Sequence, residues 1–521
     1  MEEYPRHPKG FTENQQAAVH AVVHLGATGS PDTASTGSAS AAVHEVLRKL
    51  DGVLLNTPHK FVALTWAGEG AGRLVADAVR DWPASDGVEK GKALERGNGG
   101  ESGIHVADHC DVMIVFGDRS RLKGPDPLAN VIDYARRAGR PIFWISPGNS
   151  RMAEDDHQER LDEGLGYLDC YNSEQLGDLD ERFKKESNRL RAHARQAQSA
   201  NADSGPDFLT AVSDNLLRQF VRADALAVRY QSRHMWSGAA VYGLAAVAVA
   251  IAAIQPLVFP QFPQILWAEV ASIISVICIL VASSRCGWHR KWIDYRFLAE
   301  RLRAAIFLRV GSAHCHPLEP LAQPYLAHRP NGWMVVAFSW LWGSLGETGC
   351  NEAGEDLPAV VQAGLKEFIL DEWIERQRIW FEDESTKQRR QHRRMEYLGL
   401  GLFGLTFVAA GFHATGILDV LLSNVIHLPS ILALLAIVLP AIGAALAGFR
   451  IHKEYARNAD RYAEMVRALT PIEEKVRNAP DPGTLAEALR EANDIMLREN
   501  QNWRIDFRFQ NLRIPWGPSG V

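Results

Sequence analysis

The chain has 521 residues, of which 46% are hydrophobic and 23% charged, and its formal net charge at pH 7 is −6. This length allows about two to four domains with buried cores, and the acidic balance excludes nucleic acid as a partner bound through bulk charge. The six cysteines are scattered without a CxxC pair, which favours a reducing compartment over a disulfide framework. The N-terminal stretch MEEYPRHPKGFTENQQAAV has no apolar core of a secretory signal, so we expect none there.

Residues 18–170 alternate between apolar runs and amphipathic stretches. AVVHL, KFVALTW, CDVMIVF and PIFWI predict strands, and SAAVHEVLRKLDGVLL, GRLVADAVRDW and PLANVIDYARRAG between them predict helices. This alternation is typical of an α/β fold with a doubly wound parallel sheet, whose ligands bind at the carboxyl ends of the strands.

Three glycine-rich loops fall at that edge of the predicted sheet: GATGS at 26–30, AGEGAGR at 67–73 and GDRSRLKGPDP at 117–127. A glycine turn that opens a helix presents backbone N–H groups to an anion, so a phosphate-bearing ligand is expected, although a purely structural turn also favours glycine. The candidate ligand-binding residues are Gly26, Thr28, Gly29, Ser30, Gly68, Glu69, Gly70, Arg73, Gly117, Asp118 and Asp126.

The stretch VADHCDVMIVFGD at 106–118 places polar residues at both ends of one predicted strand. His109 and Cys110 precede the strand, whereas Asp118 follows it. Because a strand of about five residues spans about 17 Å, the first pair is too far from Asp118 to share chemistry with it. We therefore expect a packing end and a binding end, with no catalytic residue assigned.

Four long apolar runs follow, at 236–259, 265–284, 397–418 and 429–449. Each has about the 20 residues needed to cross a hydrocarbon core of about 30 Å. The sequence therefore predicts four transmembrane helices that form an all-α membrane region, the alternative being buried helices of a large soluble core.

Charge predicts the orientation of these spans. Arginine and lysine cluster before the first and third spans and after the second and fourth, whereas the turns at 260–264 and 419–428 contain neither. The positive-inside rule then gives two hairpins in a bacterial inner membrane, with both termini in the cytoplasm.

The two hairpins resemble copies of one unit. The motif Ala-Glu-x-x-Arg-Ala recurs at 299–304 and 463–468, and the same offset of 164 residues (463 − 299) aligns the second span with the fourth. A duplicated unit of basic helix, hairpin and amphipathic helix is the prediction, and convergence of two ordinary hairpins is the alternative.

Three positions in the spans are pore or gate candidates. Glu269 is a charge near the outer end of its span, where it either reaches the interface or forms a cation-attracting ring in an oligomer. Pro440 weakens its helix, and Gly443 offers a small surface for close helix contact.

Two shorter segments complete the region. Residues 333–345, WMVVAFSWLWGSL, are too few to span and suit an interfacial or buried position. The HCH at 314–316 has no further ligand cluster nearby, so no metal site is expected.

These patterns divide the chain into four parts. The expected boundaries are an α/β ligand-sensing domain at 1–180, a first two-span unit at 181–330, a connecting segment at 331–385, and a second two-span unit with a C-terminal cytoplasmic helix at 386–521.

The motifs resemble known families. GATGSPD, AGEGAGRLVADAV and VADHCDVMIVFGD, in this order, are similar to the SLOG-like Rossmannoid domains of bacterial conflict systems. The hairpin units, with W-x-x-Y-R-x-L-A-E-x-L-R at 292–303, look like SLATT domains, two-span effectors associated with SLOG. The resemblance implies a sensor of a nucleotide-derived ligand joined to a membrane pore, without a further cofactor.

The chain departs from the SLOG pattern at two places. The family commonly has a Gly-Gly-Thr loop where this chain has KGPDPLAN at 123–130, and its two prolines reduce the N–H donors available to a phosphate. The segment between Trp82 and Val106 is polar and short where a further strand and lid are expected. Both put nucleotide binding in doubt.

Three functions compete on these grounds. The first is a homo-oligomeric membrane effector of antiviral defence that opens or disrupts the membrane when the N-terminal domain binds its nucleotide signal. The second is a membrane-anchored nucleotide-processing enzyme of the phosphoribohydrolase kind, with Glu69 or Asp118 as acid or base. The third is a small-solute transporter built from repeated units. The missing Gly-Gly-Thr loop argues against the enzyme, and the lack of charge pairs in the spans argues against the transporter.

Overall fold

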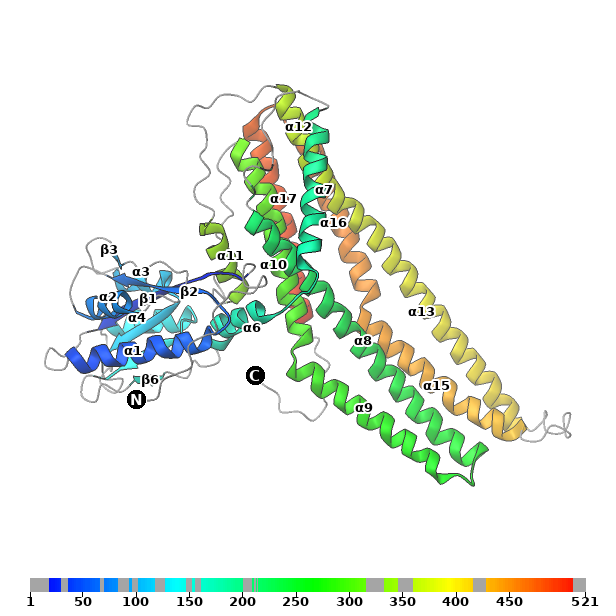
Figure 1. Cartoon of the computed structure of the whole chain (residues 1–521). Coiled ribbons are helices and arrows are strands. Elements are labelled where there is room, and N and C mark those ends of the chain that lie inside the picture. Colours follow the sequence, from blue (N-terminus) through cyan, green and yellow to red (C-terminus); the bar gives the residue numbers. More distant parts are fainter. Residues whose placement is uncertain are drawn as a thin grey trace. The chain divides into compact units, whose positions relative to one another are not determined.

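The computed structural model describes residues 18–29, 36–65, 70–82, 93–95, 102–117, 127–146, 152–154, 161–199, 209, 212, 214–314, 332–344, 359–415 and 428–508. The chain forms two compact units. The first comprises 1–185, 212–222 and 319–349, and the second comprises 186–211, 223–318 and 350–521. Figure 1 shows the helices and strands of both units.

A small, mostly parallel sheet forms the centre of the first unit. Its strands are β1 (Ala21–Gly29), β2 (His59–Thr65), β3 (Ala93–Glu95), β4 (Val112–Phe116), β5 (Ile142–Ile145) and β6 (Met152–Glu154). They lie in the order β3-β2-β1-β4-β5-β6, with only β6 antiparallel to its neighbour among these described strands. Every residue of β4 and β5 is buried, as expected of apolar runs in the middle of a parallel sheet.

Four helices accompany the sheet: α1 (Thr36–Val53), α2 (Ala71–Asp81), α3 (Ser102–His109) and α4 (Pro127–Arg137). α2 packs against α1, β1 and β2, whereas α3 packs against α4 and β1. The predicted alternation of strands and helices is therefore present, and β3 and α3 occupy the segment where the sequence is polar and short.

The first unit also contains helices from distant parts of the chain. The π-helical turn η4 (Asp162–Gly166) leads into α6 (Tyr167–Ser173), and α7 (Leu179–Ser199) begins in this unit. The short apolar helix α11 (Trp333–Ser344) packs against α6, η4 and β1 with Trp333 only 2% exposed. The segment expected to connect the two membrane units thus supplies a buried helix to the sheet domain.

Among its described residues the second unit contains helices joined by short turns, and no strand. Its elements are α8 (Asp214–Val258, whose first turns belong to the first unit), η5 (Pro263–Ile265), α9 (Leu266–Arg285), α10 (Trp288–His314), α12 (Ala359–Ile369), the π-helical turn η7 (Leu370–Ile374), α13 (Glu375–Thr415), α15 (Leu428–Lys453), α16 (Tyr455–Asn478) and α17 (Pro482–Arg508).

Four of these helices, α8, α9, α13 and α15, contain stretches long and apolar enough to cross a membrane. No more than 11% of any such stretch is buried by the rest of the chain. Large apolar side chains such as Trp267, Phe403 and Phe407 are 72–75% exposed. Apolar surface on this scale needs a nonaqueous environment, so the prediction of four membrane-length apolar helices is confirmed.

The helices that follow the apolar stretches pack on one another. α10 and α16 both contact α17, and α13 contacts α16. Trp292 of α10 lies with its ring centre 5.3 Å from that of Trp503 and 5.7 Å from that of Phe507, both on α17. An aromatic cluster therefore docks the C-terminal helix α17 against α10.

Candidate functional site

Strand β1 extends into the stretch that its glycines predict to be a loop. β1 runs through Gly29, so Gly26 and Thr28 lie in the strand and not in a loop. Gly29 has φ +96°, and a Cβ there would lie 2.0 Å from the carbonyl oxygen of Phe116 on β4. Only glycine fits this position, and it lets β1 and β4 stay paired to their ends.

The start of α2 lies at the same edge, because α2 packs on β1 and β2 and begins just after β2. Gly70, with φ 79°, precedes the helix and makes no side-chain cap. The first N–H groups of a helix have no partner inside it and carry the positive end of its dipole. Arg73 in this first turn is 74% exposed, with its Nε 3.9 Å from Asp77 Oδ2, so its guanidinium is accessible to an anion.

Gly117, which follows β4, uses its backbone N–H within the sheet. Its N–H donates to the carbonyl oxygen of Ile145 at 3.1 Å, so this donor belongs to the sheet. Gly29 at the end of β1, Gly117 after β4, and Gly70 and Arg73 at the start of α2 therefore belong to the same edge of the sheet. The candidates Ser30, Gly68, Glu69, Asp118 and Asp126 lie outside the described residues.

Cys110 and His109 lie at the other end of β4. Cys110 is fully buried in an apolar cluster, and burial raises the pKa of its thiol to about 12. Because the thiolate is the reactive form of cysteine, Cys110 is a packing residue. A Cβ at Gly26 would lie 2.9 Å from the Cys110 sulfur, so the glycine is required by this close approach.

A buried arginine ties α8 to the first unit. Arg222 is 2% exposed, and its Nη2 donates to the carbonyl oxygens of Tyr171 (2.8 Å), Asn172 (3.0 Å) and Glu174 (3.1 Å) at the end of α6. A cation here complements the negative end of the helix dipole. Asn172 in turn pairs with the backbone of Val19 next to β1, at 2.9 and 3.0 Å. Arg222 thus links the sheet to the helix that contains the first apolar stretch.

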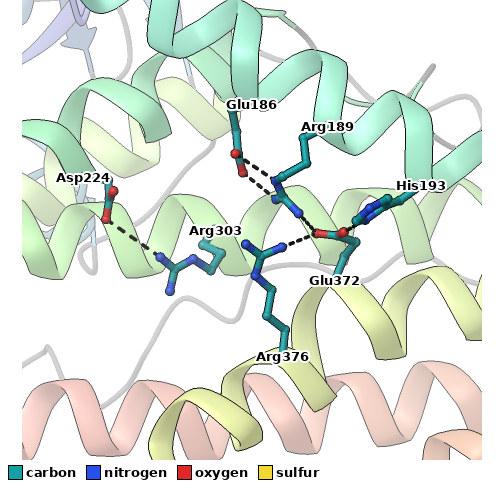
Figure 2. Close-up of polar contacts among 7 residues, drawn as sticks. All are labelled: Glu186, Arg189, His193, Asp224, Arg303, Glu372 and Arg376. Carbon is teal, nitrogen blue, oxygen red and sulfur yellow. Dashed lines mark hydrogen bonds and ion pairs between the residues drawn. The ribbon is translucent and has the colours of Figure 1, made fainter. Parts of the chain in front are cut away.

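A second network joins α7 to the base of α13 within the second unit (Figure 2). Glu372 lies on the π-helical turn η7 with its side chain 1% exposed. Its carboxylate accepts hydrogen bonds from Arg189 and His193 of α7 and from Arg376 of α13, the last at 3.1 Å. Arg189 is held from its own helix by Glu186, at 2.6 and 3.0 Å. One buried acid therefore fixes two helices to each other.

Figure 2 shows a further ion pair next to this network. Arg303 of α10 lies between two acids: its Nη1 is 2.7 Å from Glu300 of its own helix and its Nη2 is 3.9 Å from Asp224 of α8. The acids and arginines of α7, α8, α10 and α13 thus meet in one region of the second unit.

Two glycines set the contact between α8 and α15. A Cβ at Gly448 would lie 2.5 Å from Cε1 of Tyr242, and one at Gly238 would lie 2.2 Å from Nε2 of His452. Figure 1 shows α15 between α8 and α13, and α15 packs against α13 as well. These glycines let the helices of the two membrane units approach closely.

Histidines surround this contact. The ring centre of His234 on α8 is 4.5 Å from that of His289 on α10 and 4.9 Å from that of His452 on α15. Within the described residues no group of three or more histidine, cysteine or acidic residues has the arrangement of a metal site. The cluster joins α8, α10 and α15 through ring contacts.

The three pore or gate candidates lie on α9 and α15, outside the close contact between α8 and α15. Glu269 lies in the first turn of α9 and is half-buried, and Pro440 lies inside the continuous helix α15. A Cβ at Gly443 would meet nothing within 4 Å. Close packing therefore uses Gly448 and not Gly443.

The comparisons with known proteins bear on the second membrane unit. Residues 370–503 match the family model SLATT_1, described as SMODS and SLOG-associating 2TM effector domain 1. No curated protein and no solved structure matches the chain. The match begins at η7, which contains Glu372, and includes α13, α15, α16 and most of α17. The part of the chain that contains the third and fourth apolar helices is thus similar to a two-span effector domain of conflict systems.

Proposed function

We propose that this protein is a ligand-gated membrane effector of a bacterial defence system. In this proposal the first unit binds a nucleotide-derived signal, and the second unit responds by opening or disrupting the inner membrane. The observation that carries it is the match of 370–503 to a two-span effector domain, together with four apolar helices whose surfaces are exposed.

We further infer that the first unit is a SLOG-like, doubly wound domain. The strand order and the helix contacts support this, because α1 and α2 pack together while α3 and α4 pack together. The order changes direction between β1 and β4, and in such sheets ligands bind at this point outside the carboxyl ends of the strands. The first turn of α2 would then receive a phosphate, with Arg73 as the pairing cation.

Coupling would run along α7 and α8. Arg222 attaches the start of α8 to α6 and hence to the sheet, and α7 extends from the first unit to Glu372. A ligand shifts such an equilibrium only if it binds the two states with different affinity. We therefore expect the bound state to favour a different position of α8 or α7 relative to α13.

The arrangement in the membrane is also part of the proposal. Basic residues flank the apolar stretches on one side only, so both termini lie in the cytoplasm and each pair of apolar helices forms a hairpin. Four spans in one subunit make a poor pore, so the active form is a homo-oligomer, with Glu269, Pro440 and Gly443 as candidates for its lining. The second hairpin unit then arises by duplication of the first.

The test is dye release from liposomes that contain the purified full-length protein. Cyclic nucleotides and ADP-ribose-type nucleotides are added one at a time, and release is measured for the wild type, Arg73→Ala and Arg80→Ala. Arg80 is a matched control because it lies on the same helix and is 62% exposed, but at the opposite end from the candidate site.

Release that requires one nucleotide, is lost in Arg73→Ala and is kept in Arg80→Ala supports the proposal. Release without any ligand dependence, combined with nucleotide turnover by the protein in detergent, contradicts it in favour of the membrane-anchored enzyme. Loss of release in both variants contradicts the role of Arg73.

A further inference from the structure

Two helices enter their apolar stretches through the same arrangement of side chains. In α8 these are Arg229, Arg233 and Trp236, and in α13 they are Arg390, Arg394 and Tyr397. In both cases the spacing is i, i+4 and i+7, which places the three side chains on one face of a helix.

Both faces are exposed. Trp236 is 74% exposed and Tyr397 is 72% exposed, and all four arginines are exposed. The guanidinium of Arg233 lies over the ring of Tyr230, 5.4 Å from its centre, and this fixes its side chain along α8 without covering it. Aromatic residues of this size are seldom left uncovered in water.

The order of side chains along each face matches the layers of a lipid monolayer. With a rise of 1.5 Å per residue, each aromatic ring begins about 4.5 Å beyond the second arginine. Beyond Tyr397 the exposed side chains are apolar, with Leu398 55% and Leu400 67% exposed. Cation, aromatic ring and aliphatic side chain correspond to headgroup, interface and acyl chain.

The charge around the face on α13 favours an anion. Arg393 is exposed beside Arg394, whereas Lys387, one turn before Arg390, already pairs with Glu384 at 3.0 Å. Glu396 is two residues from Arg394 and therefore points in another direction from it, although it lies one turn from Arg393. A purely solvated basic face would not need the adjoining aromatic ring, and an acidic protein partner would not suit the apolar continuation.

We propose that each of these two faces binds the headgroup of an anionic phospholipid, with the arginine pair on the phosphate and the aromatic ring at the interface. The inference rests on the membrane insertion of α8 and α13, and not on a nucleotide ligand or on gating. It assigns a specific lipid partner to residues that the proposed function uses only for orientation.

The test is native mass spectrometry of the full-length protein in detergent, titrated with phosphatidylglycerol or with phosphatidylcholine. The variants are the pairs Arg229→Gln with Arg233→Gln, and Arg390→Gln with Arg394→Gln. The matched control, Arg467→Gln with Arg498→Gln, removes the same charge from exposed positions on α16 and α17. Flotation with phosphatidylcholine vesicles checks that every variant still inserts.

The wild type should bind phosphatidylglycerol at two sites and phosphatidylcholine much more weakly. Each double variant should keep one site and bind at the other about 25-fold more weakly, because an arginine near an anionic surface contributes about a factor of five. The control should bind as the wild type does, and the difference should shrink at high salt.

Equal binding of both lipids by the wild type, unchanged binding in both double variants, or an equal loss in the control would overturn the proposal. Failure of the wild type to float with vesicles would instead contradict membrane insertion, and the proposed function with it. A protein that inserts and releases dye on ligand addition, yet shows no lipid preference, leaves the proposed function intact and ends only this inference.

Discussion

Replacement of Glu372 by alanine should release α7 from the base of α13. The carboxylate is 1% exposed and accepts hydrogen bonds from three side chains, Arg189, His193 and Arg376. Removing one partner of a buried ion pair costs about 3–5 kcal/mol, because the remaining charge stays buried without compensation. Here Arg189 keeps Glu186, and Arg376 is 51% exposed and can be solvated, so we expect a loss of about 3 kcal/mol, at the lower end of that range.

Hydrogen exchange measured by mass spectrometry on the full chain in detergent resolves this local effect. A loss of about 3 kcal/mol corresponds to about a hundredfold faster exchange through local opening. The faster exchange should appear in peptides from the second half of α7 and the first turns of α13. Amides of the sheet provide an internal reference, because they belong to the other compact unit.

Glu382→Ala is the matched control. Glu382 lies on α13, which continues η7, and pairs with Arg378 at 3.1 Å, but it is 60% exposed, so its loss should cost about 0–1 kcal/mol. Equal exchange in the two variants would show that the burial of Glu372 contributes nothing to the attachment of α7. Faster exchange throughout the chain in Glu372→Ala would show general unfolding and would also refute the local argument.

Three further predictions follow from single contacts. Arg222→Met leaves the three carbonyl acceptors at the end of α6 without their donor and should destabilise the first unit by about 2–4 kcal/mol, which thermal unfolding followed by circular dichroism measures against exposed Arg229→Met. Gly448→Ala should weaken the contact of α8 with α15, since the new Cβ would lie 2.5 Å from Tyr242; Tyr242→Ala in the same chain should restore the melting temperature, and no restoration would contradict the steric reason. Burial raises the pKa of Glu499, with Arg296 and Arg461 opposing it, so the stability from this carboxyl is present below its unfolded pKa and is lost as pH rises through the raised value. Glu499→Gln should therefore stabilise the protein at neutral pH and flatten the dependence of its melting temperature on pH. An unchanged pH profile would refute this.

The sequence predicted those strands and helices well whose apolar pattern follows directly from their surroundings. The apolar runs of β4 and β5 and the long apolar helices needed no tertiary information, because an unbroken apolar run of the right length identifies each of them. The extent of β1 was predicted wrongly. Gly26 and Gly29 resemble a turn, but tertiary contacts with Cys110 and Phe116 require them inside the strand. Composition cannot distinguish a glycine needed for φ from one needed for space.

Only part of the candidate site could be predicted from the sequence. Arg73 and Gly70 follow from a local pattern of strand, glycine loop and helix, and the structure brings them to the edge where β1 and β4 end. The direction of Glu372 could not be predicted from an ideal helical repeat, since the π-helical turn shifts the helical phase by one residue, about 100°. An acid that an ideal helix would place elsewhere thereby faces α7. Arg222 was visible as a cation in a basic cluster, but its buried acceptors come from α6, about 50 residues earlier (222 − 172 = 50).

The contact of Arg222 with α6 and the contact of Glu372 with α7 differ in the kind of partner that each uses, and this difference matters for gating. Arg222 donates to backbone carbonyls that exist in any folded state of α6, so its bonds can be exchanged only by moving α8 as a whole. Glu372 is held by side chains, and Arg189 bonds to Glu186 on its own helix at the same time as to Glu372. If Glu372 moves away, Arg189 therefore stays paired, whereas loss of Arg222 would leave three backbone acceptors without their donor. If ligand binding moves the base of α13, we therefore expect Glu372 to lose its bonds to α7 while Arg222 keeps those to α6. Hydrogen exchange with and without ligand should then show faster exchange in α7 and unchanged protection in α6, and the reverse pattern would assign the moving contact to Arg222.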